Sequence, residues 1–235
     1  MCSEKKKEYS NINFDIAPHQ QLFQENLRLK LKDKYSTFII DECSMITNKQ
    51  KNDIFEYFTN ENIIFCGDIY YQLPPIVEGL EMTDEGFDKV IELTKNYRFK
   101  DDKLKALIKQ VREYIRLDKD FKPEKLKINR ITKEELKNKY EPSDYILCST
   151  NKLCDTYTDM FKHLKKYQIK QNYPQYDLYN GQIIYEKKGA NIINILRHGF
   201  TIHIIQGKTC KENIYIDLNS LKGWRMTYTA LSSQN

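Results

Sequence analysis

The sequence predicts an α/β protein in which two blocks of parallel sheet are joined by a helical connector. Two short apolar runs, Phe38–Ile40 and Asn62–Cys66, each end in an acidic turn, with a helical pattern between them. A charged helical stretch follows at about residues 99–143, and strand and helix patterns alternate again from Tyr145. Continuous apolar runs of this length are typical of parallel strands that are covered on both faces.

The first block reads as a strand–helix–strand unit. Residues 48–59, between the two apolar runs, place apolar side chains on one helical face: Ile54, Phe55 and Phe58. Parallel strands need such a crossover, and the carboxyl ends of both strands then meet at one edge of the sheet. We therefore expect Asp41-Glu42 and Gly67-Asp68 at that edge, where open α/β sheets bind their ligands.

Pro74-Pro75 stops regular structure, and the connector follows further along the chain. Asp101 is placed to cap a helix whose apolar residues recur at helical spacing through Ile115, and Thr132–Glu135 reads as a capping box. We expect a first domain at residues 1–98, the connector at 99–143 and a second domain at 144–235.

The second block opens with a strand at Tyr145–Cys148 and a helical pattern from Leu153 to Leu164. Lys187–Ala190 has the composition of a hairpin turn between the first two strands that follow. Further strands are expected at Gln182–Tyr185, Ile192–Leu196, Thr201–Ile205, Asn213–Leu218 and Thr227–Leu231.

Composition excludes several classes of protein. The 235 residues carry 38 Lys+Arg against 33 Asp+Glu, and a net charge of +5 permits a nucleic-acid partner without demonstrating one. None of the six cysteines forms a CxxC pair, which argues against a zinc site and favours reduced thiols in an intracellular protein. The polar start has no signal-peptide pattern, and no apolar stretch is long enough to span a membrane.

Asp41-Glu42 is the first candidate for chemistry. NTPases need one carboxylate that holds Mg²⁺ and another that positions the attacking water, and adjacent acids at a strand end deliver both. Taken alone, the pair favours solvated acids where a strand reaches the surface. The apolar run before it and Cys43-Ser44-Met45 after it shift the balance toward the NTPase interpretation.

The segment Gly67–Pro75 is the strongest signal. A strand ends in Gly-Asp, and Gln72 follows a few residues later, fixed by the rigid double proline. An amide at this position can bind a γ-phosphate by a hydrogen bond that is lost on hydrolysis. The competing interpretation is a surface turn with a proline stop.

Three segments, Phe38–Met45, Phe65–Pro75 and Leu93–Arg98, resemble three successive motifs of superfamily 1 helicases, in order. The likeness is to the Pif1/RecD-like branch, including relatives in large DNA viruses. Thr201–Thr209 and Tyr228–Ser232 resemble the fifth motif and the opening of the sixth. This resemblance covers most of the chain and implies two RecA-like domains, of which the first is truncated at its N-terminus.

The resemblance implies roles for individual residues. Asp41 would hold Mg²⁺, Glu42 would activate water, and Gln72 would contact the γ-phosphate of ATP. Arg98 would reach the same phosphate as an arginine finger, since its planar fork suits charge on phosphoryl oxygens. A salt bridge or a solvated helix end is the alternative for Arg98.

The resemblance also implies contacts to DNA. Gln206-Gly207 would lie between the nucleotide and the nucleic acid, and the remaining candidates for DNA contact are Thr150, Asn151, Thr201, His203 and Thr209. His203 on an apolar segment is more often a core residue, and Thr150-Asn151 reads equally well as a helix N-cap. The aromatic side chains Tyr70, Tyr71 and Trp224 can stack on bases, although packing is the default for all three.

The pattern departs from the family in three places. The first 40 residues contain no glycine, so the phosphate-binding loop G-x-x-x-x-G-K-[ST] is absent. Gly207-Lys208-Thr209 matches the end of such a loop, but Ile202 stands where its first glycine should be. Ser233 follows Ala230-Leu231-Ser232 where the family has a second arginine finger, and Gln72 lies one residue further from Gly67-Asp68 than is usual.

Two functions therefore compete. One is an ATP-dependent 5′→3′ DNA helicase, as a piece of a longer polypeptide, acting with ATP and Mg²⁺ on single-stranded or forked DNA in replication or repair. The other is a catalytically inactive remnant with residual nucleic-acid binding. An RNA helicase of the RNA-virus type is disfavoured, because Gln72–Pro75 is more similar to the DNA branch. Oligomeric state is not indicated.

Overall fold

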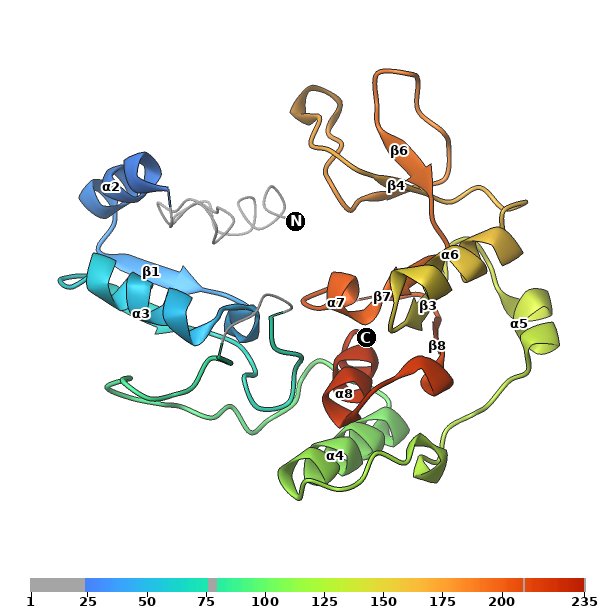
Figure 1. The fold of residues 1–235 in the computed structure, drawn as a ribbon, viewed down its shortest axis with the longest axis horizontal. Coiled ribbons are helices and arrows are strands. Elements are labelled where there is room, and N and C mark those ends of the chain that lie inside the picture. The colour runs from blue at the N-terminus through green and yellow to red at the C-terminus, as the bar shows by residue number, and fades with distance from the viewer. Residues whose placement is uncertain (1–23, 76–79, 209, 235) are drawn as a thin grey trace. The chain divides into compact units, whose positions relative to one another are not determined.

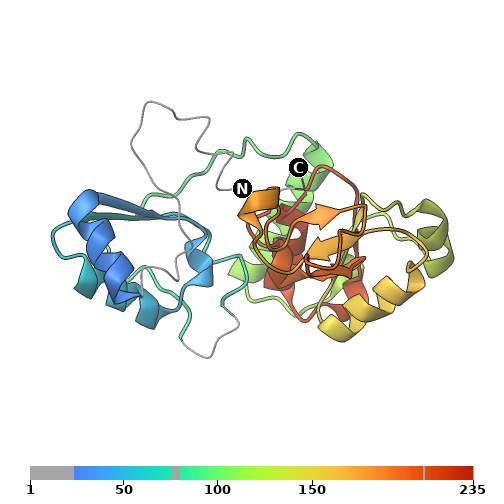
Figure 2. The same cartoon turned by 90° about the horizontal axis from the view of Figure 1, so that it is seen from above.

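The structure, a computed structural model, describes residues 24–75, 80–208 and 210–234. The chain forms two compact units. Unit 1 runs to Tyr70 and resumes at Pro74–Asp88, and unit 2 comprises Tyr71–Leu73 and Lys89–Asn235. In Figures 1 and 2 unit 1 runs from blue to teal, and most of unit 2 runs from green to red.

The described residues of unit 1 form a two-stranded parallel sheet, which confirms the predicted strand–helix–strand unit (Figure 1). The side chain of Thr47 accepts from the amide of Gln50, and the Gln50 side chain bonds back to Thr47, so a capping box starts the crossover helix. The described elements of unit 1 are α2 (Glu25–Lys34), β1 (Thr37–Ile40), the 3₁₀ turn η2 (Cys43–Met45), the crossover helix α3 (Asn48–Tyr57) and β2 (Asn62–Phe65).

Only one face of this sheet is buried by the described residues. Phe38 and Ile40 of β1 pack with Ile54 of α3, whereas Ile39 is 66% exposed and Ile64 is 47% exposed. The expectation that these strands are covered on both faces is therefore wrong for the described part of the chain. The apolar runs reflect one packed layer, and the alternating side chains of a strand point to the opposite face.

Unit 2 contains a three-stranded parallel sheet in the order β7-β3-β8. It is built from β3 (Tyr145–Cys148), α6 (Asn151–Met160), β7 (Gly199–Thr201), α7 (Ile202–Ile205), β8 (Ile214–Ile216), η5 (Leu218–Ser220) and α8 (Trp224–Ser232). Leu147, in the central strand, and Phe200, in β7, are buried beneath Ala230 of α8, so the sheet and this helix share one core.

Residues 99–143, expected from the sequence to form a connector, lie in unit 2. They contain α4 (Asp102–Arg116), η3 (Pro123–Lys125) and α5 (Lys133–Lys139). Asp101 caps α4 by accepting from the amides of Lys103 and Leu104, as predicted. The buried face of α4 packs against Trp224, Tyr228 and Leu231, so this helix covers α8 (Figure 1).

A second, antiparallel sheet interrupts unit 2 between α6 and β7. Its strands are β4 (Tyr167–Ile169), β5 (Ile183–Ile184) and β6 (Asn194–Leu196), with η4 (Pro174–Tyr176) between the first two. The predicted hairpin through Lys187–Ala190 is wrong, because β5 and β6 both pair with β4 and not with each other. The three-residue β4 is too short to give a recognisable pattern in the sequence.

Two predicted strands are helices. Ile202–Ile205 forms α7 after a strand that ends at Thr201, and the segment expected as a strand at Thr227–Leu231 lies inside α8. Seven of the nine residues of α8 are buried, so this helix is covered on nearly all sides. A buried helix segment cannot be distinguished from a buried strand by periodicity, which explains both errors.

In the described residues, no helix combines the length and the hydropathy that a membrane crossing requires.

Candidate functional site

The predicted acids of unit 1 lie immediately after β1. Asp41 is exposed, and its Oδ1 accepts a hydrogen bond from the amide of Glu42 at 3.0 Å. Glu42 has φ 54° and ψ 44°, a left-handed conformation that a side chain other than glycine adopts at a cost. The strand therefore turns sharply at Glu42 and continues into η2, which presents the two acids at the sheet edge.

The turn after β2 lies at the same edge, as the parallel register requires. The amide of Cys43 donates to the carbonyl of Cys66 at 2.9 Å, which ties the two turns together. A Cβ on Gly67 would be 2.7 Å from the Cys43 nitrogen, so the turns approach more closely than any other residue permits. The close contact fixes the backbone on which Asp41 and Glu42 stand.

The two thiols at this edge carry no charge at neutral pH. Burial, and then the neighbouring Cys66, raises the pKa of Cys43 to about 11. Burial also raises the pKa of Cys66, and the carboxylate of Asp41 adds to that effect. The negative charge at the edge therefore comes from the carboxylates, which is the condition for attracting a divalent cation.

The chemistry of these acids fits Mg²⁺ that is bound together with a nucleotide. In the described residues, no cluster of three or more His, Cys, Asp or Glu side chains is arranged to hold a metal ion by itself. Mg²⁺ in nucleotide sites usually has one or two carboxylates and completes its shell with phosphate and water. Asp41 would supply one such carboxylate, with Glu42 next to it, whereas the 235-residue sequence holds no G-x-x-x-x-G-K-[ST] loop to cradle the phosphates.

Gln72 lies in the three-residue segment that belongs to unit 2. Its carbonyl accepts from Nε of Arg225 at 2.8 Å, and its side-chain Oε1 accepts from Nε2 of Gln206 at 3.5 Å. The next residue, Leu73, donates its amide to Oγ1 of Thr229 at 3.1 Å, and its carbonyl accepts from Gln206 at 3.2 Å. The structure thus brings Gln72 and Gln206 together, as two of the predicted nucleotide contacts.

Replacing Thr229 by valine is expected to lower the free energy of unfolding of unit 2 by about 1–2 kcal/mol, because the buried amide of Leu73 loses its acceptor. Trp224, the single tryptophan of the chain, reports this transition by fluorescence in urea. Thr227→Val is the matched control, since the Thr227 hydroxyl donates to the carbonyl of Gly223 within the same helix. Equal losses in the two variants would contradict the assigned role of Thr229.

Arg98 is exposed and lies at the C-terminus of α8. Its Nη1 donates to the carbonyl of Ser232 at 3.3 Å, and its amide donates to Oδ1 of Asn96 at 3.0 Å. A cation is stabilising beside the carbonyls that end a helix. Arg98 therefore lies next to Ser232 and Ser233, where the resemblance to the sixth motif ends.

The candidates around α7 differ in accessibility. Gln206 is buried and follows α7, and Gly207 has φ +73°, the left-handed turn that glycine supplies. Thr201 is also buried, directly before α7. His203 is half-buried, and burial lowers its pKa. Thr209 lies outside the described residues.

Thr150 and Asn151 begin α6. Thr150 is the N-cap, and its hydroxyl accepts from the amide of Leu153 at 3.3 Å. Asn151 is exposed, and its Oδ1 accepts from Nη2 of Arg197 at 3.4 Å. The helix-cap interpretation is confirmed for Thr150, and that role leaves the exposed Asn151 as the more accessible of the two.

The three aromatic candidates mostly pack against protein. Trp224 is buried, and its Nε1 donates to the carbonyl of Lys119 at 2.8 Å. Tyr71 packs against Tyr228, and the hydroxyl of the more exposed Tyr70 donates to Asp84 at 2.6 Å. Trp224 is thus a core residue of unit 2.

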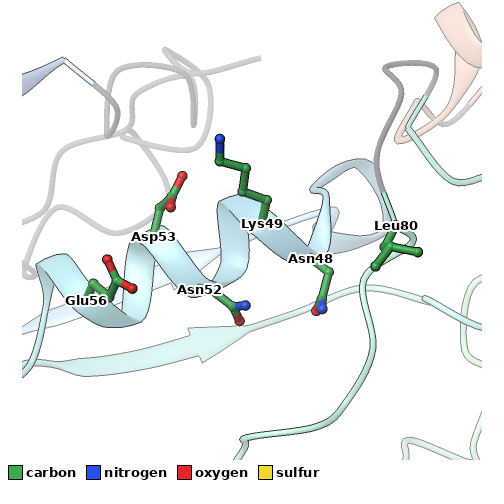
Figure 3. A pocket seen from close by; sticks show the side chains of 6 residues that line it. All are labelled: Asn48, Lys49, Asn52, Asp53, Glu56 and Leu80. Carbon is green, nitrogen blue, oxygen red and sulfur yellow. The ribbon is translucent and has the colours of Figure 1, made fainter.

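A hollow of about 370 Å³ lies elsewhere on unit 1, over the outer face of α3 (Figure 3). Its lining combines Lys49 with Asp53 and Glu56, as well as Asn48, Asn52 and Leu80. None of the residues predicted from the sequence lines it, and its mixed charge favours no particular ligand.

Arg225 is the site residue that sequence reasoning missed. It stands 153 positions from Gln72, and no local pattern distinguishes it from other cations on helices. The contact becomes visible only when α8 and the Tyr71–Leu73 segment are brought together by the fold.

The family model described as an AAA domain matches residues 12–119. No curated protein matches the chain.

Solved structures of Pif1 helicases are similar to nearly the whole chain. The Bacteroides Pif1 helicase in complex with ADP-AlF3 and ssDNA is 16% identical with a TM-score of 0.61, covering 97% of this chain and 73% of its own. The Candida albicans Pif1 helicase is 14% identical with a TM-score of 0.62, covering 93% and 75%. A structure of two Pif1 helicases that unwind forked dsDNA is 17% identical with a TM-score of 0.56, covering 98% and 75%. The chain therefore has the α/β fold of Pif1 helicases, as the resemblance implied.

Proposed function

We propose that this chain, which has the fold of Pif1 helicases, is the motor region of an ATP-dependent DNA helicase. The observation that carries the proposal is the edge of the unit 1 sheet. There the parallel register of β1 and β2 brings Asp41-Glu42 beside the turn at Gly67-Asp68. Open α/β sheets bind nucleotides at such an edge.

In this proposal Asp41 holds Mg²⁺ and Glu42 activates the attacking water. Mg²⁺, when bound, neutralises charge on the phosphate oxygens. Gln72 contacts the γ-phosphate, Arg98 stabilises the charge that develops on it, and Gln206-Gly207 adjoins the nucleotide. Arg98 is exposed, as that role requires, and its contact with the Ser232 carbonyl at the end of α8 also fits the alternative of a solvated helix end.

The partner we propose is single-stranded or forked DNA, in the 5′→3′ direction that the family resemblance implies. The proposed contacts to the DNA backbone are Asn151, His203 and Thr209. Thr150, directly before α6, and Thr201, directly before α7, are also proposed to contact the DNA. The Pif1 structures with ssDNA and forked dsDNA support this partner. The setting is an intracellular site of DNA replication or repair, including those of large DNA viruses.

A catalytically inactive remnant with residual DNA binding is the second candidate. It is favoured by the lack of G-x-x-x-x-G-K-[ST] anywhere in the sequence and by Ser233 in the place of the second arginine finger. Both candidates predict the same fold and differ in whether ATP is hydrolysed.

The purified 235-residue chain is expected to bind an oligo(dT) strand while hydrolysing ATP negligibly, with or without DNA. Binding measured by fluorescence anisotropy should weaken at least about tenfold between 50 and 200 mM salt, as phosphate contacts release counterions.

Binding without salt dependence, or none at all, would remove DNA as the partner. Appreciable DNA-stimulated ATPase activity would instead refute the expected inactivity of the chain alone. The coding region upstream of Met1 separates the two candidates. A strand followed by G-x-x-x-x-G-K-[ST] there supports a motor, and its lack supports a remnant.

A further inference from the structure

Three consecutive backbone groups of unit 2 are each bound by a side chain that is distant in sequence. The carbonyl of Gln72 accepts from Arg225, and the amide of Leu73 donates to Thr229. The carbonyl of Leu73 then accepts from Gln206. Backbone groups in an irregular segment have no helix or sheet partner, so each needs a hydrogen bond from elsewhere. Hydrogen bonds with three side chains that are distant in sequence therefore hold Gln72 and Leu73 in place.

We propose that Arg225 is a positioning residue for Gln72, an inference that rests on the proposed function, in which Gln72 contacts the γ-phosphate. The Arg225 Nε lies 2.8 Å from the Gln72 carbonyl, a charge-assisted hydrogen bond of the stronger kind. Fixing this carbonyl fixes the backbone from which the Gln72 side chain extends. Arg225 thus acts on the nucleotide through Gln72 and does not itself reach the phosphates.

The geometry of α8 explains why Arg225 and Thr229 act together. They are four residues apart, so their side chains lie on the same face of the helix. The Thr229 hydroxyl also donates to the carbonyl of Arg225 at 2.9 Å, which orients its lone pair toward the amide of Leu73. One helix face therefore binds two successive backbone groups of the segment.

Tyr71, the residue before Gln72, packs against two other side chains of unit 2. The Tyr71 ring lies 5.7 Å from that of Tyr228, and the guanidinium of Arg112 in α4 lies 4.2 Å above it. These contacts anchor Tyr71 independently of Arg225. The loss of Arg225 is therefore expected to release Gln72 and Leu73 while Tyr71 stays in place, which makes the effect local.

Hydrogen–deuterium exchange on the full chain tests the proposal. In Arg225→Ala the amide of Leu73 should exchange at least about tenfold faster, the factor that corresponds to one lost hydrogen bond. Arg225→Lys, which keeps a cationic donor, should recover most of the protection. Lys222→Ala removes an exposed charge just before α8 and should match the wild-type chain.

Unchanged exchange at Leu73 in Arg225→Ala would overturn the proposal. Faster exchange throughout α8 would also overturn it, because Arg225 would then support the helix and not the segment.

DNA binding separates this inference from the proposed function. Arg225→Ala should leave the affinity for oligo(dT) within about twofold and the salt dependence unchanged, because a positioning residue releases no counterions. A loss of about one unit in the salt slope would show that Arg225 binds DNA phosphate directly and would overturn its positioning role. If the wild-type chain binds no DNA, the proposed function fails, and the exchange experiment still decides the role of Arg225.

Discussion

Acidification from pH 6.5 to pH 4 is expected to lower the free energy of unfolding of unit 2 by about 3 kcal/mol, through His198 alone. This imidazole is fully buried. Its Nε2 lies 3.1 Å from the Leu164 carbonyl, which can only accept, so Nε2 carries the proton. Nδ1 then accepts from the Tyr140 hydroxyl at 2.9 Å, and the neutral ring satisfies both partners.

The direction of this change in stability follows from the pKa of His198 in the unfolded and the folded states. Burial, with a smaller effect of the nearby Lys166 and His163, lowers the pKa of His198 from 6.5 to about 4. Well above pH 6.5 the ring is neutral in both states, and its full contribution to stability is present. As the pH falls from 6.5 to 4, His198 binds a proton in the unfolded chain but stays mostly neutral in the folded protein. The free energy of unfolding therefore decreases across this pH range.

Urea unfolding at pH 7 and pH 4, followed by Trp224 fluorescence, measures this loss. His198→Gln should be less stable at pH 7 and should depend less on pH between these values. His163→Gln replaces an exposed histidine that has only a small effect on the pKa of His198, so this variant should keep most of the wild-type dependence. A pH dependence in His198→Gln as steep as that of the wild-type chain would show that other groups cause the transition.

Gly67→Ala is expected to destabilise unit 1 by about 2–3 kcal/mol, because overpacking against backbone atoms cannot be relieved by a side-chain rotation. The new Cβ would lie 2.7 Å from the Cys43 nitrogen and 2.8 Å from its Sγ. Moving the two turns apart would weaken the hydrogen bond from Cys43 to Cys66. The acids at the sheet edge then lose the support that fixes their backbone.

Exchange of the Cys43 and Cys66 amides, with thermal unfolding by circular dichroism, measures this effect. Gly189→Ala is the control, since a Cβ there meets no atom within 4 Å. If Gly67→Ala protects both amides as well as the wild-type chain does, the close approach of the two turns does not hold the edge together.

The sequence predicts those parts of the fold whose signal is local. Capping residues such as Asp101 and Thr132 act on amides two or three positions away, so the starts of α4 and α5 can be read directly. The interior of α8 gives no such signal, because burial on nearly all sides removes its periodicity. The exposed Ile39 likewise looks the same in the sequence as a buried one.

The residues of the candidate site likewise differ in whether a local pattern in the sequence identifies them. Asp41 and Glu42 are recognisable because they end an apolar run, and their positions follow from the pairing of β1 with β2. Their roles, and those of Gln72 and Arg98, remain predictions. Arg225 could not be predicted, because its partner lies on another element and carbonyl groups carry no sequence signature.

The antiparallel β4–β6 sheet leaves and rejoins the rest of unit 2 at a narrow neck. The amide of Arg197 donates to the carbonyl of Lys166 at 2.8 Å, so the two ends of this excursion are in contact. Once the ends are joined, doubling the length of the intervening chain costs only about 0.6 kcal/mol in closure entropy. The stability of the parallel sheet should therefore depend little on the length of the segment inserted between Lys166 and Arg197. We expect this to be the place where an insertion can be lengthened, shortened or replaced while the core stays the same.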